Sequence, residues 1–302
     1  MNTKERLLCS RTNTKNLQRS CFPCALNFLM EVRHGLHDTR FSKRLSDGKY
    51  DRFRDSAGQP WNEKPEKYYS NGKKYKVLWL LHGTFGDHSD WIRKSNIELY
   101  ASERDLIVVM PSGLNANYAN WEHFSIGFNM YDFLTQELMP LIYGWFPASD
   151  KREDNYIAGL SMGGRGTCVY AFNHPELFAG AAVLSAAPRD IEWDRKVNPQ
   201  YFERTQGSID NRGGLKEYVE SYENTWRVLD EAVAAGKKLP KLYFACGKDD
   251  ALYNGYLHFK EHAQEIGLEA KFEEIDGYKH EWRFWDLTIE KALDYLVGEK
   301  KK

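Results

Sequence analysis

From about residue 75 onward, the chain alternates short apolar runs with longer stretches whose apolar residues recur at helical spacing. The apolar runs are continuous rather than alternating, which is typical of strands covered on both faces. Alternating β and α units require parallel strands joined by right-handed crossovers. We therefore predict an α/β fold, with a mostly parallel central sheet and helices on both faces. The predicted strands are Lys76–Leu81, Leu106–Met110, Asn155–Leu160, Ala179–Leu184, Lys241–Cys246 and Ala270–Ile275.

Helical patterns fill the gaps between these runs. Apolar residues from Leu215 to Val233 recur every three or four positions and build one stripe. Met130–Trp145 predicts a helix that must bend or break before Pro140, and Arg283–Val297 predicts a closing helix. Residues 186–214 lack steady periodicity and contain several Pro and Gly. An insertion at this position would lie over the carboxyl ends of the strands, where ligands bind in such sheets.

Composition excludes several classes of protein. The 302 residues allow one large domain or two ordinary ones. With 42 Lys and Arg against 43 Asp and Glu, the net charge is −1, so no strong field attracts nucleic acid or an acidic membrane surface. Hydrophobic residues make up 42% of the chain, which excludes wholesale disorder. No apolar run approaches the 18 residues of a membrane span.

The amino-terminal part has a different character. Its first 20 residues are basic and Cys21–Val32 is fairly apolar, which crudely resembles a signal peptide. However, Asn27 and Glu31 interrupt the apolar stretch, and no small-residue cleavage site follows. We predict a poorly ordered N-terminal extension over residues 1–34. We expect a cytoplasmic protein, with secretion left open.

A metal site is not expected. Cys21 and Cys24 form a C-x-x-C pair, and His34 and His37 follow it. A zinc finger needs about twelve residues between its ligand pairs and a wider His–His gap, so this spacing fits no such template.

The strongest chemical signal is the segment GLSMGG, residues 159–164, directly after a predicted strand and directly before a helical stretch. This G-x-S-x-G context is typical of a sharp strand-to-helix turn that exposes a nucleophilic serine. Gly159 and Gly163 leave room for backbone packing, while Ser161 lies at the tip. The free N–H groups of the helix start can stabilise an oxyanion. Ser161 is therefore the predicted nucleophile.

A serine hydroxyl needs a base to accept its proton, and the base needs an orienting carboxylate. In this fold the order along the chain is Ser, acid, His. Asp249 and Asp250 follow the strand Lys241–Cys246, and His280 follows the last strand. We predict His280 as the base and one of the two acids as its partner. His258 and His262 are four residues apart on a polar helix and are predicted to be solvated.

An oxyanion hole in this fold uses the N–H of the residue after the nucleophile and a second N–H from an earlier loop. The first is that of Met162. The segment HGTFGD, residues 82–87, follows the strand Lys76–Leu81 and provides the second, for which we predict Thr84. His82 is expected to shape this loop by packing and hydrogen bonding rather than to act as a base.

Several motifs, in order, resemble the esterase D / tributyrin esterase branch of the α/β-hydrolases, which includes S-formylglutathione hydrolases, feruloyl and acetyl esterases and mycolyltransferases. The resemblance covers about residues 75–298. It implies a serine esterase with Ser161 as nucleophile, His280 as base and Asp250 as acid, with Asp249 as the fallback. The matching segments are LLHGTFGDHSDW (80–91), MYDFLTQELMPLI (130–142), GLSMGGRG (159–166), NHPELFAGAAVLS (173–185), CGKDDALY (246–253) and KHEWRFWD (279–286).

Two segments depart from that family's pattern. Residues 35–74 do not show the antiparallel strand pair with which the family usually opens. The S-formylglutathione hydrolases carry a Ser-Trp-Tyr-type stretch where this chain reads Asn117-Tyr118-Ala119-Asn120-Trp121, which favours simple esterases over that thioesterase.

One nucleophile, one acid and one base imply a single catalytic domain over residues 35–302. We predict a carboxylesterase for short acyl (acetyl or butyryl) or feruloyl-type esters, acting through an acyl-enzyme without metal or organic cofactor. The alternatives are a thioesterase, an acyltransferase, and a catalytically silent binding module. The expected partner is a small-molecule ester, and a carbohydrate-linked alcohol is one option for its alcohol half. The resemblance also allows a homo-oligomer. Trp91, Trp121 and Trp282 flank the motif loops and are predicted to line the substrate pocket, although core packing explains each equally well.

Overall fold

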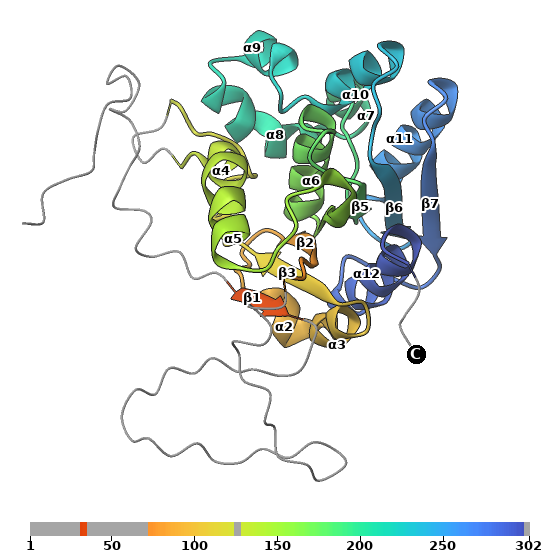
Figure 1. The fold of residues 1–302 in the computed structure, drawn as a ribbon. Helices are drawn as coiled ribbons and strands as arrows, with labels where there is room; N and C mark the ends of the chain where they lie inside the picture. Colours follow the sequence, from red (N-terminus) through yellow and green to blue (C-terminus); the bar gives the residue numbers. More distant parts are fainter. Residues whose placement is uncertain (1–30, 35–71, 124–127, 299–302) are drawn as a thin grey trace, which may run out of the picture.

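The computed structural model describes residues 31–34, 72–123 and 128–298. They form a seven-stranded sheet of order β1-β3-β2-β4-β5-β6-β7, in which only β1 runs antiparallel to its neighbour (Figure 1). All six predicted strands are present, with bounds that differ by at most one residue. The strands are β1 (Glu31–His34), β2 (Lys76–Leu81), β3 (Leu106–Met110), β4 (Asn155–Leu160), β5 (Gly180–Leu184), β6 (Lys241–Gly247) and β7 (Ala270–Ile275).

The edge strand β1 was not predicted. It pairs Glu31 with Met110 and His34 with Ile107 of β3. It lies at the end of the segment 1–34 that the sequence assigned to an N-terminal extension, so the sheet begins earlier than expected. The rest of that segment, including Cys21 and Cys24, and residues 35–71 lie outside the described residues.

Helices cover both faces of the sheet, as predicted (Figure 1). Alternate residues of β2 enter two separate apolar clusters: Trp79 packs with one set of helices and Leu80 with the other. The first cluster includes residues of α6 (Met162–Asn173), α10 (Thr225–Ala234) and α11 (Tyr253–Glu265). The second includes residues of α2 (Asp90–Lys94), α3 (Ile97–Ser102) and α12 (Trp282–Leu296). Burial on both sides explains why the strands are continuously apolar.

The helix over residues 130–145 is distorted where the sequence predicted. It consists of α4 (Met130–Asp132), a π-helical segment η2 (Phe133–Leu138) and α5 (Met139–Trp145). Pro140 has no N–H to donate to the carbonyl one turn earlier, and its ring crowds that carbonyl. The wider π turn directly before Pro140 accommodates the proline.

The apolar stripe from Leu215 to Val233 is helical, as its spacing predicts, but it does not form one continuous helix. The stripe is divided between α9 (Leu215–Glu220) and α10. The Ser221 hydroxyl accepts the Glu223 N–H at 3.2 Å, and the Asn224 side chain caps the start of α10. Side chains that bond to nearby backbone N–H groups offer an alternative to helical hydrogen bonds, and the helix ends there.

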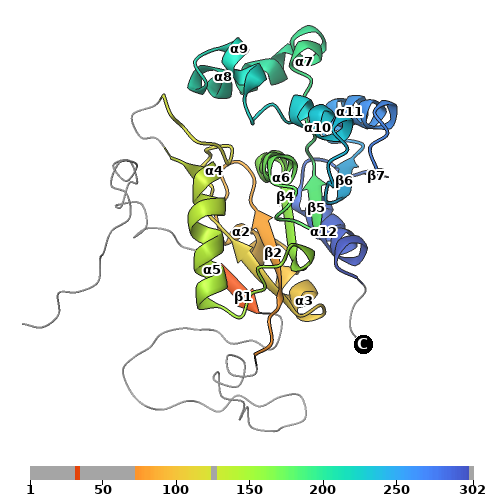
Figure 2. The same cartoon turned by 45° about the horizontal axis from the view of Figure 1, so that its top comes forward.

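The insertion predicted over residues 186–214 lies beyond the carboxyl ends of the strands. Together with α9 it forms a cap of three helices, α7 (Ile191–Val197), α8 (Pro199–Asn211) and α9, set apart from the sheet in Figure 2. Arg212, at the end of α8, bonds Glu223 at 2.6 Å, the Tyr222 hydroxyl at 2.6 Å and the Asn120 carbonyl at 3.2 Å. These bonds anchor the cap to the body of the protein.

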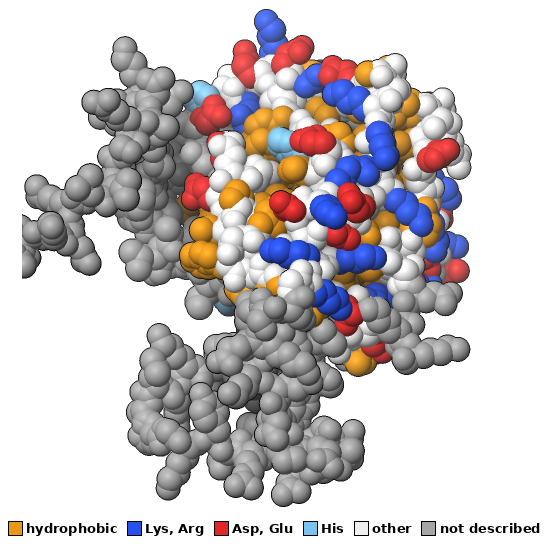
Figure 3. All heavy atoms as spheres, in the orientation of Figure 1, with side chains coloured by type: hydrophobic (Ala, Val, Ile, Leu, Met, Phe, Trp, Pro, Cys, Tyr) orange, Lys and Arg blue, Asp and Glu red, His pale blue; other side chains and the backbone are white. Residues whose placement is uncertain are grey.

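Basic and acidic side chains are interspersed on the face of the protein seen in Figure 3, and no large patch of one charge is visible there. This agrees with the balanced charge of the chain. In the described ranges, no helix is long and apolar enough to cross a membrane.

A buried amide links the layers near the start of β4. The side-chain oxygen of Asn155 accepts hydrogen bonds from Trp79 Nε1 and from the Tyr143 hydroxyl, each at 2.9 Å. Its amide nitrogen donates to the carbonyls of Ser149 and Lys151. Asn155 is fully buried, and removing it would leave buried donors without an acceptor.

We predict that Asn155→Ala lowers the free energy of unfolding by about 2–5 kcal/mol, because a buried polar group left unpaired costs about 1–3 kcal/mol. Urea unfolding followed by tryptophan fluorescence measures the change. The matched control is Asn254→Ala, at an exposed position of α11, where we expect a change below about 0.5 kcal/mol. Equal stability of the two variants would contradict this role for Asn155.

Candidate active site

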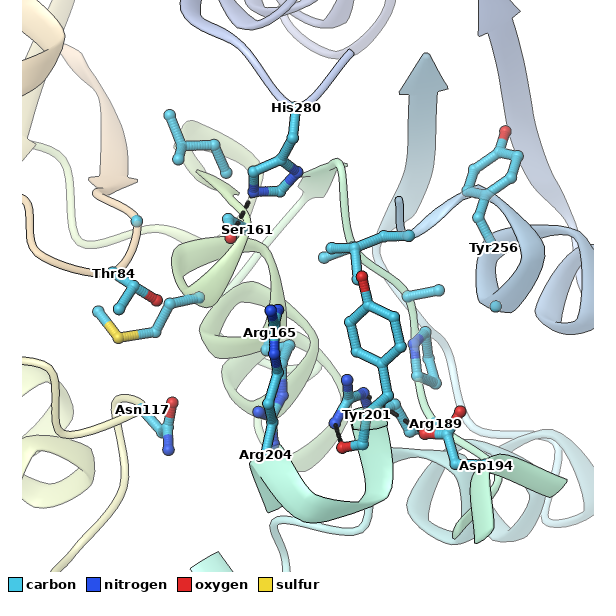
Figure 4. A pocket seen from close by; sticks show the side chains of 18 of the residues that line it. Thr84, Asn117, Ser161, Arg165, Arg189, Asp194, Tyr201, Arg204, Tyr256 and His280 are labelled. Carbon is cyan, nitrogen blue, oxygen red and sulfur yellow. Dashed lines mark hydrogen bonds and ion pairs between the residues drawn. The ribbon is translucent and has the colours of Figure 1, made fainter. Parts of the chain in front are cut away.

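A cavity of about 830 Å³ lies between the carboxyl ends of the strands and the cap. Five of the predicted site residues line it: Ser161, His280, Thr84, Met162 and Trp282. The first three are labelled in Figure 4. Residues far apart in the sequence meet here because parallel strands end at the same edge of the sheet. Within the described ranges, no group of three or more His, Cys, Asp or Glu could hold a metal ion.

Ser161 occupies a strained turn between β4 and α6. Its φ of 52° and ψ of −116° are unfavourable for a residue with a side chain, and they point the hydroxyl into the cavity. A Cβ on Gly163 would lie 2.4 Å from the Leu81 carbonyl oxygen, and one on Gly159 would lie 2.4 Å from the backbone of Gly163. Both positions therefore require glycine, as the sequence predicted, because the turn packs directly against the end of β2.

A continuous line of hydrogen bonds joins the three predicted catalytic side chains. His280 Nε2 lies 2.9 Å from Ser161 Oγ, and His280 Nδ1 lies 2.9 Å from Asp250 Oδ2 and 3.1 Å from Oδ1. Asp250 is buried, whereas Asp249 is exposed, and the Asp249 backbone N–H donates to the Tyr278 carbonyl. Of the two acids left open by the sequence, the geometry brings Asp250 to the histidine.

The environment of Asp250 stabilises its charged form. Burial alone would raise the pKa of this carboxyl, but hydrogen bonds from His280, the Leu252 N–H and the Ser185 hydroxyl outweigh burial and hold the pKa below its usual value. Trp285 Nε1 donates to Ser185 Oγ at 2.9 Å, which leaves the hydroxyl proton free to point at Asp250. Asp250 is therefore a fixed, ionised acceptor for the histidine.

Sequence reasoning missed Ser185 and Trp285. Ser185 directly follows β5, at the same edge of the sheet as the predicted site residues, and this position is the signal that could have found it. Its left-handed φ of 49° gives no sequence signal, because only tertiary packing forces a serine into it.

The two predicted oxyanion donors flank Ser161. Met162 is the first residue of α6, so its N–H has no acceptor one turn earlier within the helix. The loop after β2 lies alongside, since a Cβ on Gly83 would be 3.5 Å from the Ser161 Cβ. Thr84 follows on that loop, whose shape is held by a hydrogen bond from the Phe85 N–H to Asn115 Oδ1 at 2.6 Å.

His82 holds the base of this loop, as predicted. It is buried, its Nε2 accepts the Gly113 N–H at 2.7 Å, and its Nδ1 lies 2.7 Å from the Gly83 carbonyl oxygen. Because Nε2 accepts, the proton is on Nδ1 and is donated to that carbonyl. Burial lowers the pKa of His82, which keeps the ring neutral. Both ring nitrogens are occupied, so His82 is not available as a base.

Of the three predicted pocket tryptophans, the structure brings only Trp282 to the cavity. Trp91 is fully buried and donates from Nε1 to the Leu81 carbonyl, and its ring packs edge-to-face on Trp282. Trp121 bonds the Ala116 carbonyl and does not line the cavity. Trp193 and Trp285, which were not predicted, line it instead.

The prediction that His258 and His262 are solvated was wrong. The His258 ring stacks between Trp193 and Trp226, with centroids 4.4 Å and 5.2 Å away, and bonds Asp190 at 3.2 Å. His262 stacks on Trp226 and bonds Asp230 at 2.6 Å. The cap and α10 cover this face of α11, and neither contact is visible in the local sequence.

Comparison with known proteins agrees with this geometry. Residues 61–296 match the family model described as "Putative esterase". The chain belongs to the putative esterase family. It is therefore a serine carboxylic ester hydrolase with an α/β-hydrolase fold.

Three relatives of this esterase are informative. An acetyl esterase of Caldicellulosiruptor saccharolyticus is 27% identical over 78% of this chain and 89% of the relative. The Staphylococcus aureus fluorophosphonate-binding serine hydrolase FphF is 32% identical over 80% of this chain and 91% of its own, with a TM-score of 0.65. The S-formylglutathione hydrolase FrmB of the same organism is 31% identical over 74% and 85%, with a TM-score of 0.61.

We predict that Gly163→Ala destabilises the esterase by about 1–3 kcal/mol, because the new methyl group must displace the backbone at the end of β2. Gly144→Ala is the matched control. Gly144 lies within α5, where a Cβ meets nothing within 4 Å, so alanine should raise stability by about 0.5–1 kcal/mol. Thermal and urea unfolding measure both effects. A stable Gly163→Ala variant would contradict the tight packing of the turn.

Proposed function

We propose that the protein hydrolyses short-chain acyl esters, with Ser161 as nucleophile, His280 as general base and Asp250 as the residue that orients it. The observation that carries the proposal is the unbroken chain of hydrogen bonds from Ser161 Oγ through the His280 ring to Asp250, at the wall of an open cavity. The acetyl esterase among the relatives supports a small acyl group.

In the acylation step, Ser161 Oγ attacks the ester carbonyl while His280 Nε2 accepts the hydroxyl proton. Asp250 accepts the Nδ1–H bond, which fixes the ring tautomer and stabilises the imidazolium that forms. The oxyanion accepts hydrogen bonds from the N–H groups of Met162 and Thr84. Loss of one such donor typically costs about 2.7–4 kcal/mol of transition-state stabilisation.

The tetrahedral intermediate then collapses. The bond to the alcohol oxygen breaks, and His280 gives its proton to the leaving alcohol, which leaves an acyl group on Ser161. Water attacks this acyl-enzyme with His280 again as base, and release of the carboxylic acid restores the serine. Apart from the ester and water, these steps use side chains and backbone of the described residues.

A thioesterase of the S-formylglutathione type is the second candidate. It is favoured by the 31% identity to FrmB, whereas the Asn117–Trp121 stretch favours simple esters. The candidates are distinguished by comparing kcat/KM for S-formylglutathione with kcat/KM for 4-nitrophenyl acetate, 4-nitrophenyl butyrate and a feruloyl ester. An added alcohol or sugar acceptor tests acyl transfer by product analysis.

We predict that Ser161→Ala lowers kcat for 4-nitrophenyl acetate by about 10⁴-fold or more, because the covalent route is lost. Ser102→Ala, at an exposed position on α3, is the control and should match the wild type. Circular dichroism checks that both variants fold. Turnover by Ser161→Ala at the wild-type rate would sink the proposal.

Covalent labelling distinguishes an esterase from a catalytically silent binding module. The wild-type protein should form a covalent adduct with a fluorophosphonate probe, and Ser161→Ala should not. A folded wild-type protein that takes no label would favour the binding module.

The choice between the two neighbouring acids has a direct test. We predict that Asp250→Asn lowers kcat by about 10³-fold or more, because an amide cannot stabilise the imidazolium and favours the wrong tautomer. Asp249→Asn removes the same charge from the exposed neighbour and should retain activity within about twofold of wild type. If Asp249→Asn were the inactive variant, the assignment of the acid would be reversed.

A cytoplasmic location, assembly into a homo-oligomer and a carbohydrate-linked alcohol stay predictions from the sequence and its resemblance. Feruloyl-type esters remain within the proposed substrate range.

A further inference from the structure

The wall of the cavity opposite His280 is basic. Arg165 on α6, Arg189 before α7 and Arg204 on α8 all line it. In Figure 4, Arg165 and Arg204 lie between Ser161 and α8, on the side away from His280. A neutral ester offers no negative charge for these three arginines to bind.

Each acidic residue that lines the cavity already pairs with a basic side chain. Asp194 lies 3.6 Å from Arg189, and Asp90 pairs with Arg93 and Lys94 at 2.7 Å and 3.0 Å. Asp190 caps the start of α7 and bonds His258.

Two guanidinium groups have no carboxylate of their own, because Asp194, which acts electrostatically on Arg165, forms its ion pair with Arg189. No acidic side chain in the described ranges forms an ion pair with Arg165 or Arg204. Arg165 has a hydrogen bond with the buried Tyr218 hydroxyl, and Arg204 lies over the Tyr201 ring at 5.0 Å. These neutral contacts position the two cations without cancelling their charge.

The electrostatics of the buried arginine are consistent with an excess of positive charge. Burial and the neighbouring charge of Arg165 together lower the pKa of Arg189 to about 10, and the effect of Arg165 is larger than the opposing effect of Asp194. An anion in this part of the cavity would relieve that repulsion.

The arginines are also within reach of the reacting centre. Arg165 lies one turn of α6 beyond Ser161, with its N–H bonded to the Ser161 carbonyl at 3.0 Å. One turn corresponds to a rise of about 5.4 Å, so one small molecule can span both positions. Guanidinium groups bind carboxylates through two parallel hydrogen bonds, which gives orientation as well as attraction.

We propose that the cap side of the cavity binds a carboxylate carried by the ester substrate, through Arg165 and Arg204. This inference rests on the proposed esterase function and narrows it to acidic esters. The carboxylate belongs either to the acyl half or to the alcohol half of the substrate, and the two sources require separate substrate pairs.

Two matched pairs of esters test the proposal. Mono-4-nitrophenyl adipate against 4-nitrophenyl hexanoate places the charge on the acyl half. 4-Acetoxybenzoate against its methyl ester places it on the alcohol half. In at least one pair, the wild-type enzyme should have the higher kcat/KM for the acid, and this preference should weaken as salt screens the charges.

The variants Arg165→Gln and Arg204→Gln should each reduce the ratio of kcat/KM for acid over neutral ester by about tenfold or more. Arg204 is exposed, so its replacement leaves the core intact if Arg165→Gln fails to fold. The control Arg195→Gln removes an arginine from α7 that is outside the cavity lining and should leave the ratio unchanged. The proposal would be overturned if the wild-type enzyme had the higher kcat/KM for the neutral ester in both pairs. It would also be overturned if Arg204→Gln left the ratio of kcat/KM for acid over neutral ester unchanged.

A binding measurement separates this inference from catalysis. By calorimetry, the Ser161→Ala protein should bind 4-hydroxybenzoate at least about tenfold more tightly than 4-hydroxybenzamide, and Arg204→Gln should remove the difference. If no ester is hydrolysed but this difference is found, the esterase proposal fails and the carboxylate site stands. If esters are hydrolysed and the two compounds bind equally, the carboxylate site fails and the esterase proposal stands.

Discussion

The site depends on one close contact between backbones, where the turn after β4 packs against the end of β2. Gly163 approaches the Leu81 and His82 carbonyl oxygens so closely that no side chain fits, and the Ser161 N–H donates to the Leu184 carbonyl at 2.8 Å. This packing holds Ser161 in a backbone conformation that it would not otherwise adopt. It also sets the start of α6 beside the loop that follows β2.

The remaining parts of the site come from the same edge of the sheet. β5 leads to Ser185, β6 to Asp250 and β7 to His280, so each of these three strands delivers one member of the hydrogen-bonded line. Because β4, β5 and β6 are buried on both faces, their ends are fixed relative to one another, which preorganises the groups that must align. The cap lies over the cavity and contributes Arg189 and Arg204 to the basic wall, while Arg165 comes from α6.

The fold was largely predictable because its signals are local. Most of the parallel strands are continuous apolar runs, although the edge strand β7 contains Lys271, Glu273 and Glu274, and the turn at Ser161 requires glycines at fixed offsets. Asp250 and Asp249 could not be separated by residue type, and only the resemblance ranked them. The stacking of His258 and the break between α9 and α10 depend on contacts with the cap or on local capping by side chains. The basic cavity wall was not predicted, since its residues lie on separate elements.

The account is tested most directly by identifying the acyl-enzyme. Acid quenching of the reaction with 4-nitrophenyl butyrate, followed by peptide mass spectrometry, should find the butyryl group on Ser161 in the wild-type protein. In His280→Gln, the group should form far more slowly, because no base accepts the serine proton. An acyl group on another residue, or full turnover with no acylated serine at any time, would contradict the account.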